Sequence, residues 1–220
     1  MPRDKMTFLV IGLGNFGAAV AKDLKRFGNY VIGVDTDESI ISDHAEQLDQ
    51  ALILDARDEH ALREIGAADC DVGVVGLGHD LEASVLATMN LRLVGVDKIW
   101  AKASSKTHHR ILTRLGADRV IHPEERVGKQ VAQMLHNPLI RDYVSLGNSY
   151  HVVNLRIPDE LNGKSTEALN LAKFDLRCLG IMRGTEFLAY GDETVELEGN
   201  DMLLVLGKRG DLRAFTSSIG

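Results

Sequence analysis

Three glycines with the spacing G-x-G-x-x-G are the first feature of this sequence that points to chemistry. Gly12, Gly14 and Gly17 lie in the stretch VIGLGNFG at residues 10–17. In such a motif the first glycine permits a tight turn and the second lets the backbone approach a pyrophosphate. The third lets a helix pack closely on a strand. The N–H groups at the start of that helix then favour a phosphate group. A glycine-rich turn that binds nothing is the alternative, and the flanking sequence weighs against it.

An acid follows at the distance that ribose recognition requires. Asp35 ends the apolar run YVIGVD, 18 residues after Gly17. A carboxylate at this place accepts hydrogen bonds from ribose hydroxyls and repels a 2′-phosphate. Thr36, Asp37 and Glu38 come next and include no cation that would bind such a phosphate, so NADP is not expected. A helix N-cap or a turn is the other common use of an acid here.

Three later apolar runs are also followed by residues suited to a ligand crevice. In an open parallel sheet the carboxyl ends of the strands meet at one edge, where ligands bind. Asp55 can accept a hydrogen bond from adenine, Gly78 permits close backbone approach, and Lys102 can meet a phosphate. Each residue alone is equally well explained as an ordinary loop residue. The full set is Asp55, Ala56 and Arg57, then Gly76, Leu77, Gly78 and His79, then Lys102, Ala103 and Ser104.

The sequence offers no evident catalytic constellation. Its eight histidines are scattered, and His108 and His109, adjacent on an expected helix, point about 100° apart and do not form a metal-binding face. The motif His122-Pro123-Glu124 can bring a carboxylate to the crevice. We therefore expect a binding module rather than an enzyme. The alternatives are an NAD-dependent oxidoreductase with a small substrate domain, and a structural oligomerisation module with a vestigial site.

The elements that must position these residues alternate regularly along the first part of the chain. Apolar, β-branched runs separated by amphipathic segments indicate parallel βαβ units, with both faces of the sheet covered. We expect a Rossmann-like, doubly wound α/β domain with strand order 3-2-1-4-5-6. The expected strands are 7–11, 30–35, 51–54, 72–76, 98–102 and 119–122, and the expected helices are 16–27, 39–48, 58–65, 81–93, 106–115 and 124–135.

The pattern changes near His136-Asn137-Pro138, because proline ends a helix. We place the boundary between 136 and 149 and define the domains as 1–138 and 139–220. The second is expected to be a small α+β domain with mostly antiparallel strands. Its expected strands are 150–157, 176–183, 186–190 and 201–207, with one short helix over 166–174.

Composition limits the possible partners and cellular location of the protein. A net charge of −7 and the lack of a basic run argue against nucleic-acid binding. Cys70 and Cys178 are far apart in the sequence and are expected to be free thiols in a reducing cytosol. The uncharged stretch 6–21 resembles the apolar part of a signal peptide, but its glycines suit a phosphate loop better. We expect a cytoplasmic protein.

Several stretches together resemble the RCK (regulator of K+ conductance) family, also called the KTN or TrkA type. The resemblance extends over essentially the whole chain, and LGADRVIHPE is its most specific part because dehydrogenases lack it. The length resembles that of single-repeat KtrA-type subunits. The stretches are VIGLGNFG, VIGVD, VVGLGHDLEAS, KIWAKASSKTHHRILTRLGADRVIHPEERVG, GIMRGTE and EGNDMLLVLG.

The resemblance implies a cytoplasmic gating subunit beneath a membrane K+-transporting partner of the KtrB/TrkH type. Chains would pair through the helix 124–135 and assemble into an octameric ring, whose shape would respond to ATP, ADP or NAD(H). Val127, Val131, Met134 and Leu135 form an apolar stripe on that helix, which fits pairing or packing on its own domain equally well. A second ligand, cyclic-di-AMP, binds the small domain of some relatives.

The resemblance also assigns ligand positions by residue. They are Gly12, Gly14, Asn15, Gly17, Asp35, Asp55, Ala56, Leu77, Gly78, His79, Lys102, Ala103, Ser104, His108 and Glu124. Glu124 resembles an acid that faces the nucleotide phosphates, sometimes through a cation. One position departs from the pattern: ATP-responsive relatives often have Arg where this chain has Asn15, and a neutral amide cannot balance a γ-phosphate as a guanidinium can. ADP, AMP and NAD(H) therefore stay open beside ATP.

Overall fold

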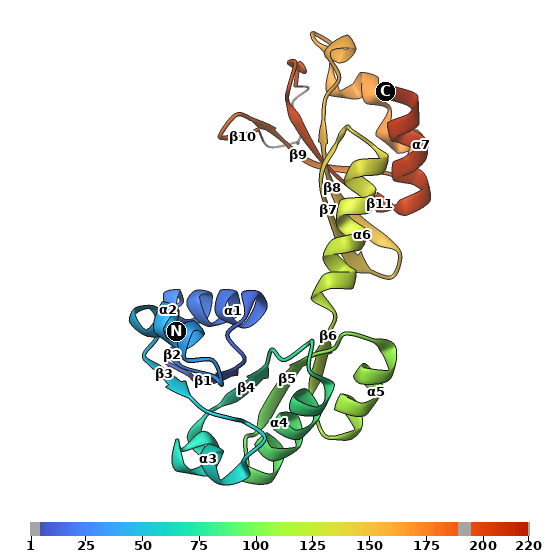
Figure 1. The fold of residues 1–220 in the computed structure, drawn as a ribbon. Helices are drawn as coiled ribbons and strands as arrows, with labels where there is room; N and C mark the ends of the chain where they lie inside the picture. The colour runs from blue at the N-terminus through green and yellow to red at the C-terminus, as the bar shows by residue number, and fades with distance from the viewer. Residues whose placement is uncertain (1–4, 189–194, 220) are drawn as a thin grey trace. The chain divides into compact units, whose positions relative to one another are not determined.

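The computed structural model describes residues 5–188 and 195–219, and it divides into two compact units, Met1–Glu124 and Glu125–Gly220 (Figure 1). The sequence placed this division after residue 138, beyond helix α6 (Pro123–His136). In the structure most of α6 falls in the second unit, where the Gln130 side chain donates a hydrogen bond to Asp142 Oδ1 at 2.5 Å. Each unit is described by itself below.

The first unit is built on a six-stranded parallel sheet with the order β3-β2-β1-β4-β5-β6. This order confirms the expected doubly wound topology. β3 begins and ends one residue earlier than expected, and the other strands agree closely with the expected ranges. The strands are β1 (Thr7–Ile11), β2 (Tyr30–Asp35), β3 (Gln50–Ile53), β4 (Val72–Val75), β5 (Lys98–Lys102) and β6 (Arg119–Ile121).

Helices cover both faces of this sheet, and each face has its own apolar core (Figure 1). One core joins the sheet to Ala21 of α1 (Asn15–Arg26) and Ile41 of α2 (Glu38–His44). The other joins it to α3 (Glu59–Glu64), α4 (Leu81–Val94) and α5 (Lys106–Arg114). Alternate strand residues enter opposite cores, so the central strands β1, β2 and β4 are mostly apolar, as is typical of a parallel sheet covered on both faces.

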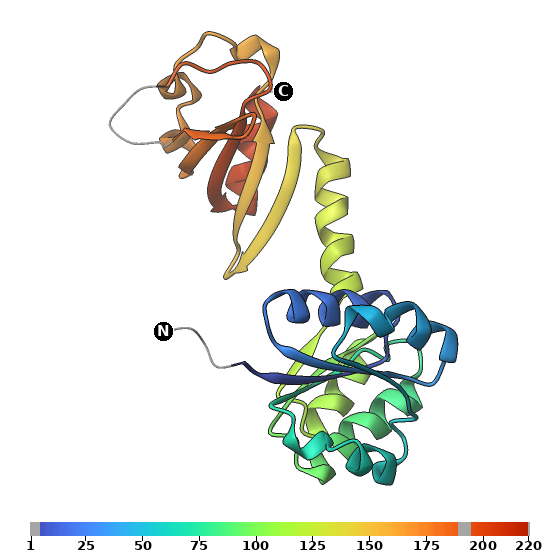
Figure 2. The ribbon, with the colours of Figure 1, turned by 90° about the vertical axis from the view of Figure 1, so that its left-hand side faces the viewer.

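The second unit has a five-stranded sheet, ordered β10-β9-β11-β8-β7, and every pairing in it is antiparallel. The expected α+β character is confirmed. Figure 2 shows the sheet with its terminal helix, which contributes Leu212 and Phe215 to the core. The elements are β7 (Ile140–Gly147), β8 (Tyr150–Arg156), β9 (Arg177–Arg183), β10 (Glu186–Leu188), β11 (Met202–Lys208) and α7 (Arg209–Ile219).

Three features of the second unit differ from expectation. β7 and α7 were not expected as elements. The single helix expected over 166–174 is two short 3-10 turns, Thr166–Leu169 and Leu171–Phe174, because Asn170 between them adopts a left-handed conformation with φ of 45°. The expected strand 186–190 is observed as β10, and its last two residues lie outside the described residues.

An ion-pair network holds the turn before β11. The Arg183 guanidinium donates to Asp201 Oδ1 at 2.9 Å and to Oδ2 at 2.8 Å, and also to the Glu196 carbonyl. Asp201 is buried and accepts a further bond from the Glu198 N–H. This network explains structurally why charged residues stand in the stretch EGNDMLLVLG.

Cys70 is buried, Cys178 is half-buried, and both are free thiols. Burial raises the pKa of the Cys70 thiol to about 11, so this thiol is chemically quiet. Among the described helices, none is both long and apolar enough to span a lipid bilayer.

Candidate functional site

The glycine-rich turn after β1 has the tight geometry that its sequence predicts. Gly12 adopts a φ of +85°, a conformation that side chains disfavour, and its N–H donates to the Val34 carbonyl at 2.8 Å. A Cβ atom added at Gly17 would lie 1.8 Å from the Gly12 carbonyl oxygen, and one at Gly12 would lie 2.6 Å from Leu77 Cδ2. The first and third glycines are therefore required by packing inside the unit.

The middle glycine, Gly14, is not required by packing. Gly14 is the N-cap of α1 in an extended conformation, is exposed, and would place an added Cβ more than 4 Å from any neighbouring atom. The protein itself therefore does not need a glycine here. The first turn of α1 carries no acidic residue, and no side chain caps it. Such a helix start favours an anion through its N–H groups and its dipole.

Asp35, at the end of β2, is hydrogen-bonded to the glycine-rich turn. Its Oδ2 accepts a bond from the Leu13 N–H at 2.7 Å, and its Oδ1 accepts one from the Asp37 N–H at 3.1 Å. The residue is half-buried. A carboxylate offers about four acceptor positions, so ribose hydroxyls can still donate to it. Asp35 therefore lies beside the glycine-rich turn, and its ribose-binding role stays a prediction.

The loop after β3 is organised by an ion pair and by one residue that sequence reasoning missed. The Arg57 guanidinium binds Asp55 in a bidentate manner, with distances of 2.7 to 3.0 Å, and lowers the pKa of that carboxyl. From α4, the buried Asn90 side chain donates to the Ala56 carbonyl at 3.0 Å and to the Arg57 carbonyl at 2.9 Å. Asn90 thus fixes the backbone of a predicted adenine-binding loop.

Three residues from separate segments meet around the side chain of Lys102. Lys102, at the end of β5, passes beneath Gly78, where an added Cβ would lie 2.6 Å from Lys102 Cε. Its ammonium forms an ion pair with Glu124 and lies 5.7 Å from the centroid of the Phe16 ring. The structure therefore brings the predicted residues Gly78, Lys102 and Glu124 together beside the first turn of α1.

His108, which the resemblance assigns to the ligand set, is held inside the first unit. It is buried, with Nε2 at 3.1 Å from Ser84 Oγ and Nδ1 at 3.3 Å from the Ser104 N–H. Burial, followed by the nearby charge of His122, lowers the pKa of His108, so the imidazole stays neutral. His108 supports the Ser104 loop from behind, as a positioning residue. Ala103, also buried, donates its N–H to the Ile121 carbonyl at 2.9 Å.

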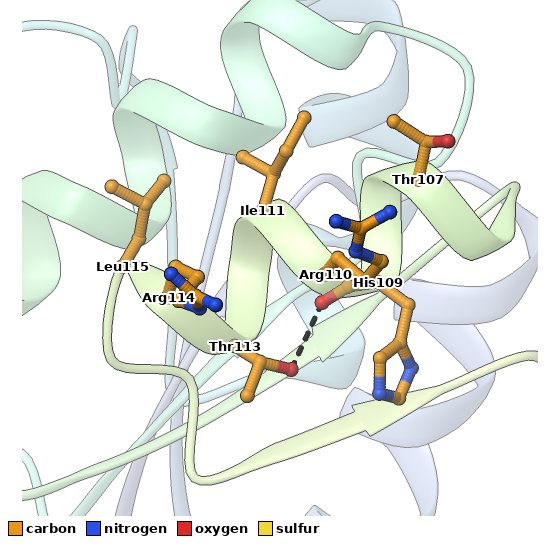
Figure 3. A pocket seen from close by; sticks show the side chains of 7 residues that line it. All are labelled: Thr107, His109, Arg110, Ile111, Thr113, Arg114 and Leu115. Carbon is orange, nitrogen blue, oxygen red and sulfur yellow. Dashed lines mark hydrogen bonds between the residues drawn. The ribbon is translucent and has the colours of Figure 1, made fainter.

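Figure 3 shows a pocket on the surface of α5. His109 lines it, and its Nδ1 lies 3.0 Å from His122 Nε2. None of the predicted ligand residues lines this pocket. Its lining is Thr107, His109, Arg110, Ile111, Thr113, Arg114 and Leu115. Within the described residues no three His, Cys, Asp or Glu side chains are arranged to hold a metal ion.

Comparisons with known proteins identify a family and relatives of this chain. The model of the TrkA-N domain family matches residues 8–123. The Ktr system potassium uptake protein A of Bacillus subtilis is 34% identical over 210 residues, which cover 94% of each chain. The Ktr system potassium uptake protein C of the same organism is 31% identical and covers 98% of each chain.

Solved structures support the fold. A structure described as the GsuK channel bound to NAD matches the whole of this chain with a TM-score of 0.67 and 16% identity. The chain spans only 40% of that channel's length, and the identity is low, so this likeness concerns the fold alone.

Proposed function

This chain belongs to the KtrA/TrkA-type RCK family, which has the TrkA-N domain, and from that premise we propose that it is the nucleotide-sensing regulatory subunit of a K+ uptake system. It would bind an adenine nucleotide at the glycine-rich turn without converting it. The bound nucleotide would act through its different affinity for two conformations of an assembled protein. The cytoplasmic face of a membrane K+-transporting partner is the proposed place of action.

The observation that carries the proposal is the contrast among the three glycines. Gly12 and Gly17 are needed for packing within the unit, whereas the open space at Gly14 serves no internal contact. That space lies at an uncapped helix start, with Asp35 bonded to the same turn. A pyrophosphate at Gly14 and a ribose at Asp35 use both features.

ADP and ATP are the leading ligands, and NAD(H) is the second choice. Asn15 is exposed at the start of α1 and carries no charge to balance a γ-phosphate. Arg57, a cation in the loop after β3, is already bound to both oxygens of Asp55. We therefore expect this chain to distinguish ATP from ADP only weakly. NADP is excluded from the proposal because Asp35 would repel its 2′-phosphate.

Assembly is proposed to use α6. None of its described residues is buried within this single chain, and Val127, Val131 and Leu135 are 54%, 40% and 80% exposed. An apolar stripe of this exposure suits a second copy of the same helix, because burying it would remove apolar area from water. Dimers formed in this way would build an octameric ring beneath the membrane partner.

The test is thermal unfolding and calorimetric titration of the full chain with ATP, ADP, AMP, NAD, NADH and NADP. A ligand at about 100 times its Kd stabilises the folded state by about 2.7 kcal/mol, so a true ligand raises the Tm clearly. We expect shifts with ADP and ATP, none with NADP, and no change in NADH absorbance over hours. If no adenine nucleotide raises the Tm, the proposal fails in favour of a structural module.

Gly14→Ala supplies the matched variant, because its added Cβ meets no protein atom and its backbone conformation suits alanine. The variant should unfold at the wild-type temperature and lose the nucleotide-induced shift. Gly210→Ala is the control, since Gly210 lies in α7 and also has no neighbour within 4 Å of an added Cβ. A Gly14→Ala protein with wild-type ADP affinity would contradict the proposed place of the pyrophosphate.

A further inference from the structure

Lys102 is a buried cation whose side chain packs closely against Gly78. The residue is only 6% exposed, and its aliphatic stem passes beneath Gly78, where any side chain would collide with it. Burying an ammonium group is costly unless an anion accompanies it. The anion that the structure provides is Glu124, whose side chain is 61% exposed. The pair therefore joins a fixed cation to a carboxylate that water can reach.

The Lys102 ammonium lies near the place where a phosphate group is expected. It lies 5.7 Å from the ring centroid of Phe16, which stands in the first turn of α1, two residues after the open position at Gly14. The positive end of α1 and the ammonium of Lys102 therefore lie in the same region. The first turn of α1 contains no acid that would neutralise this positive charge. Two positive features directed to one place favour an anion there.

Positive charge near Glu124 favours the ionised form of its carboxyl group. The hydrogen bond from Lys102 is the main cause that lowers the pKa of Glu124, and the charge of His79 adds to the effect. Glu124 is therefore ionised at neutral pH. It is also the last residue of the first unit and stands in the first turn of α6.

From these contacts we infer that Glu124 is an internal competitor of the ligand: it occupies the Lys102 ammonium in the empty protein, and nucleotide phosphates displace it when they bind. The inference rests on the proposed function, because it concerns the same phosphate site. Displacement frees the carboxylate at the start of α6, so binding changes the charge environment of that helix. The cost of breaking the ion pair lowers the affinity for every phosphate-bearing ligand.

Calorimetric titration of the full chain with ADP, and with adenosine as a ligand without phosphate, tests this competition. Glu124→Gln removes the negative charge and keeps an amide oxygen to accept from Lys102, so the buried ammonium retains a partner. Because the Glu124 end of the pair is 61% exposed, its energy is taken as that of a largely solvated pair, up to about 1 kcal/mol, so ADP should bind this variant about two- to fivefold more tightly. Adenosine affinity should not change.

Two further variants make the result specific. Glu125→Gln removes the same charge from the neighbouring residue, which pairs with Lys129, and should leave ADP affinity at the wild-type value. Lys102→Met should weaken ADP binding, and adding Glu124→Gln to it should then raise ADP affinity less than Glu124→Gln does alone, because no ion pair remains to be broken. Weaker or unchanged ADP binding by Glu124→Gln, with a wild-type protein that binds ADP, overturns the competition alone. A wild-type protein that binds no ADP overturns the proposed function, and the competition with it.

Discussion

Asp35 Oδ2 accepts a hydrogen bond from the backbone N–H of Leu13 at 2.7 Å, so the acid that is expected to bind ribose also holds the turn that is expected to bind phosphate. The two residues are joined across neighbouring parallel strands, because β1 and β2 pair with Ile11 opposite Val34. One carboxylate therefore links the two halves of the proposed nucleotide site.

Replacing Asp35 separates these two tasks. Asp35→Ala loses both, and bonds to a charged group contribute about 1.5–3 kcal/mol, so ADP affinity should fall at least about tenfold. Asp35→Asn keeps an oxygen for the Leu13 N–H, so it should unfold at nearly the wild-type temperature while binding ADP more weakly. Calorimetric titration and thermal unfolding measure the two effects. Unchanged ADP affinity in Asp35→Ala would refute the placement of the ribose.

Gly17→Ala should damage the fold itself. Its Cβ would lie 1.8 Å from the Gly12 carbonyl oxygen, so α1 must move away from the sheet. Overpacking of this kind costs about 1–3 kcal/mol, which lowers the Tm by several degrees. The contrast with Gly14→Ala, which should keep its Tm, is the measurement of interest. Equal Tm values for the two variants would contradict the assignment of Gly17 to internal packing.

Asn90→Ala should destabilise the first unit and loosen the loop after β3. The change removes two hydrogen bonds and leaves the Ala56 and Arg57 carbonyls without these donors. A buried polar group left without its partner costs about 1–3 kcal/mol. Urea unfolding should show the lower free energy of unfolding, and hydrogen exchange should show faster exchange in residues 55–58. Wild-type stability would show that other contacts hold the loop.

Asp201 should make the second unit sensitive to acid. Burial alone would raise its pKa, but hydrogen bonds from Arg183 and from the Glu198 N–H lower it below its ordinary value. Because the folded-state pKa is depressed, the stabilisation is present above about pH 4 and is lost as the pH falls through the folded-state pKa.

The matched variant for that effect is Asp201→Asn, which should be less stable at pH 7 and should lose less stability than the wild type between pH 5 and 2. Removing one partner of a buried ion pair costs about 3–5 kcal/mol, here an upper bound because the Arg183 side chain is 31% exposed. Unfolding followed by circular dichroism across this range is the measurement. Parallel pH profiles for the two proteins would assign the acid sensitivity to other groups.

Sequence reasoning predicted the first unit well because its signals are local. Strand runs, glycine spacing and Asp35 each depend on a few neighbouring residues, and the parallel sheet order follows from them. The ion pair between Lys102 and Glu124 was not predictable in this way, since it depends on where β5 and the first turn of α6 end in space. Asn90 carries no local signal either, because its role depends on a loop 33 residues away.

The second unit was harder to predict. β7 alternates poorly, with mostly exposed residues such as Asp142 and Ser145, as is common in an edge strand. α7 did leave a signal, because its buried residues Leu212, Phe215 and Thr216 lie on one helical face. The division of the expected helix 166–174 into two turns depends on the left-handed backbone of Asn170, which cannot be predicted from composition alone.

The open space at Gly14 has an evolutionary consequence. No internal contact requires that glycine, so under the proposed function a single codon change at this position would abolish nucleotide binding while the chain still folds. Gene duplication followed by such a change would yield a paralogue that assembles with the same partners but does not bind nucleotide. Mixed assemblies would then respond less to the nucleotide. Under the proposed function, nucleotide sensing and folding could therefore be lost independently of each other by mutation.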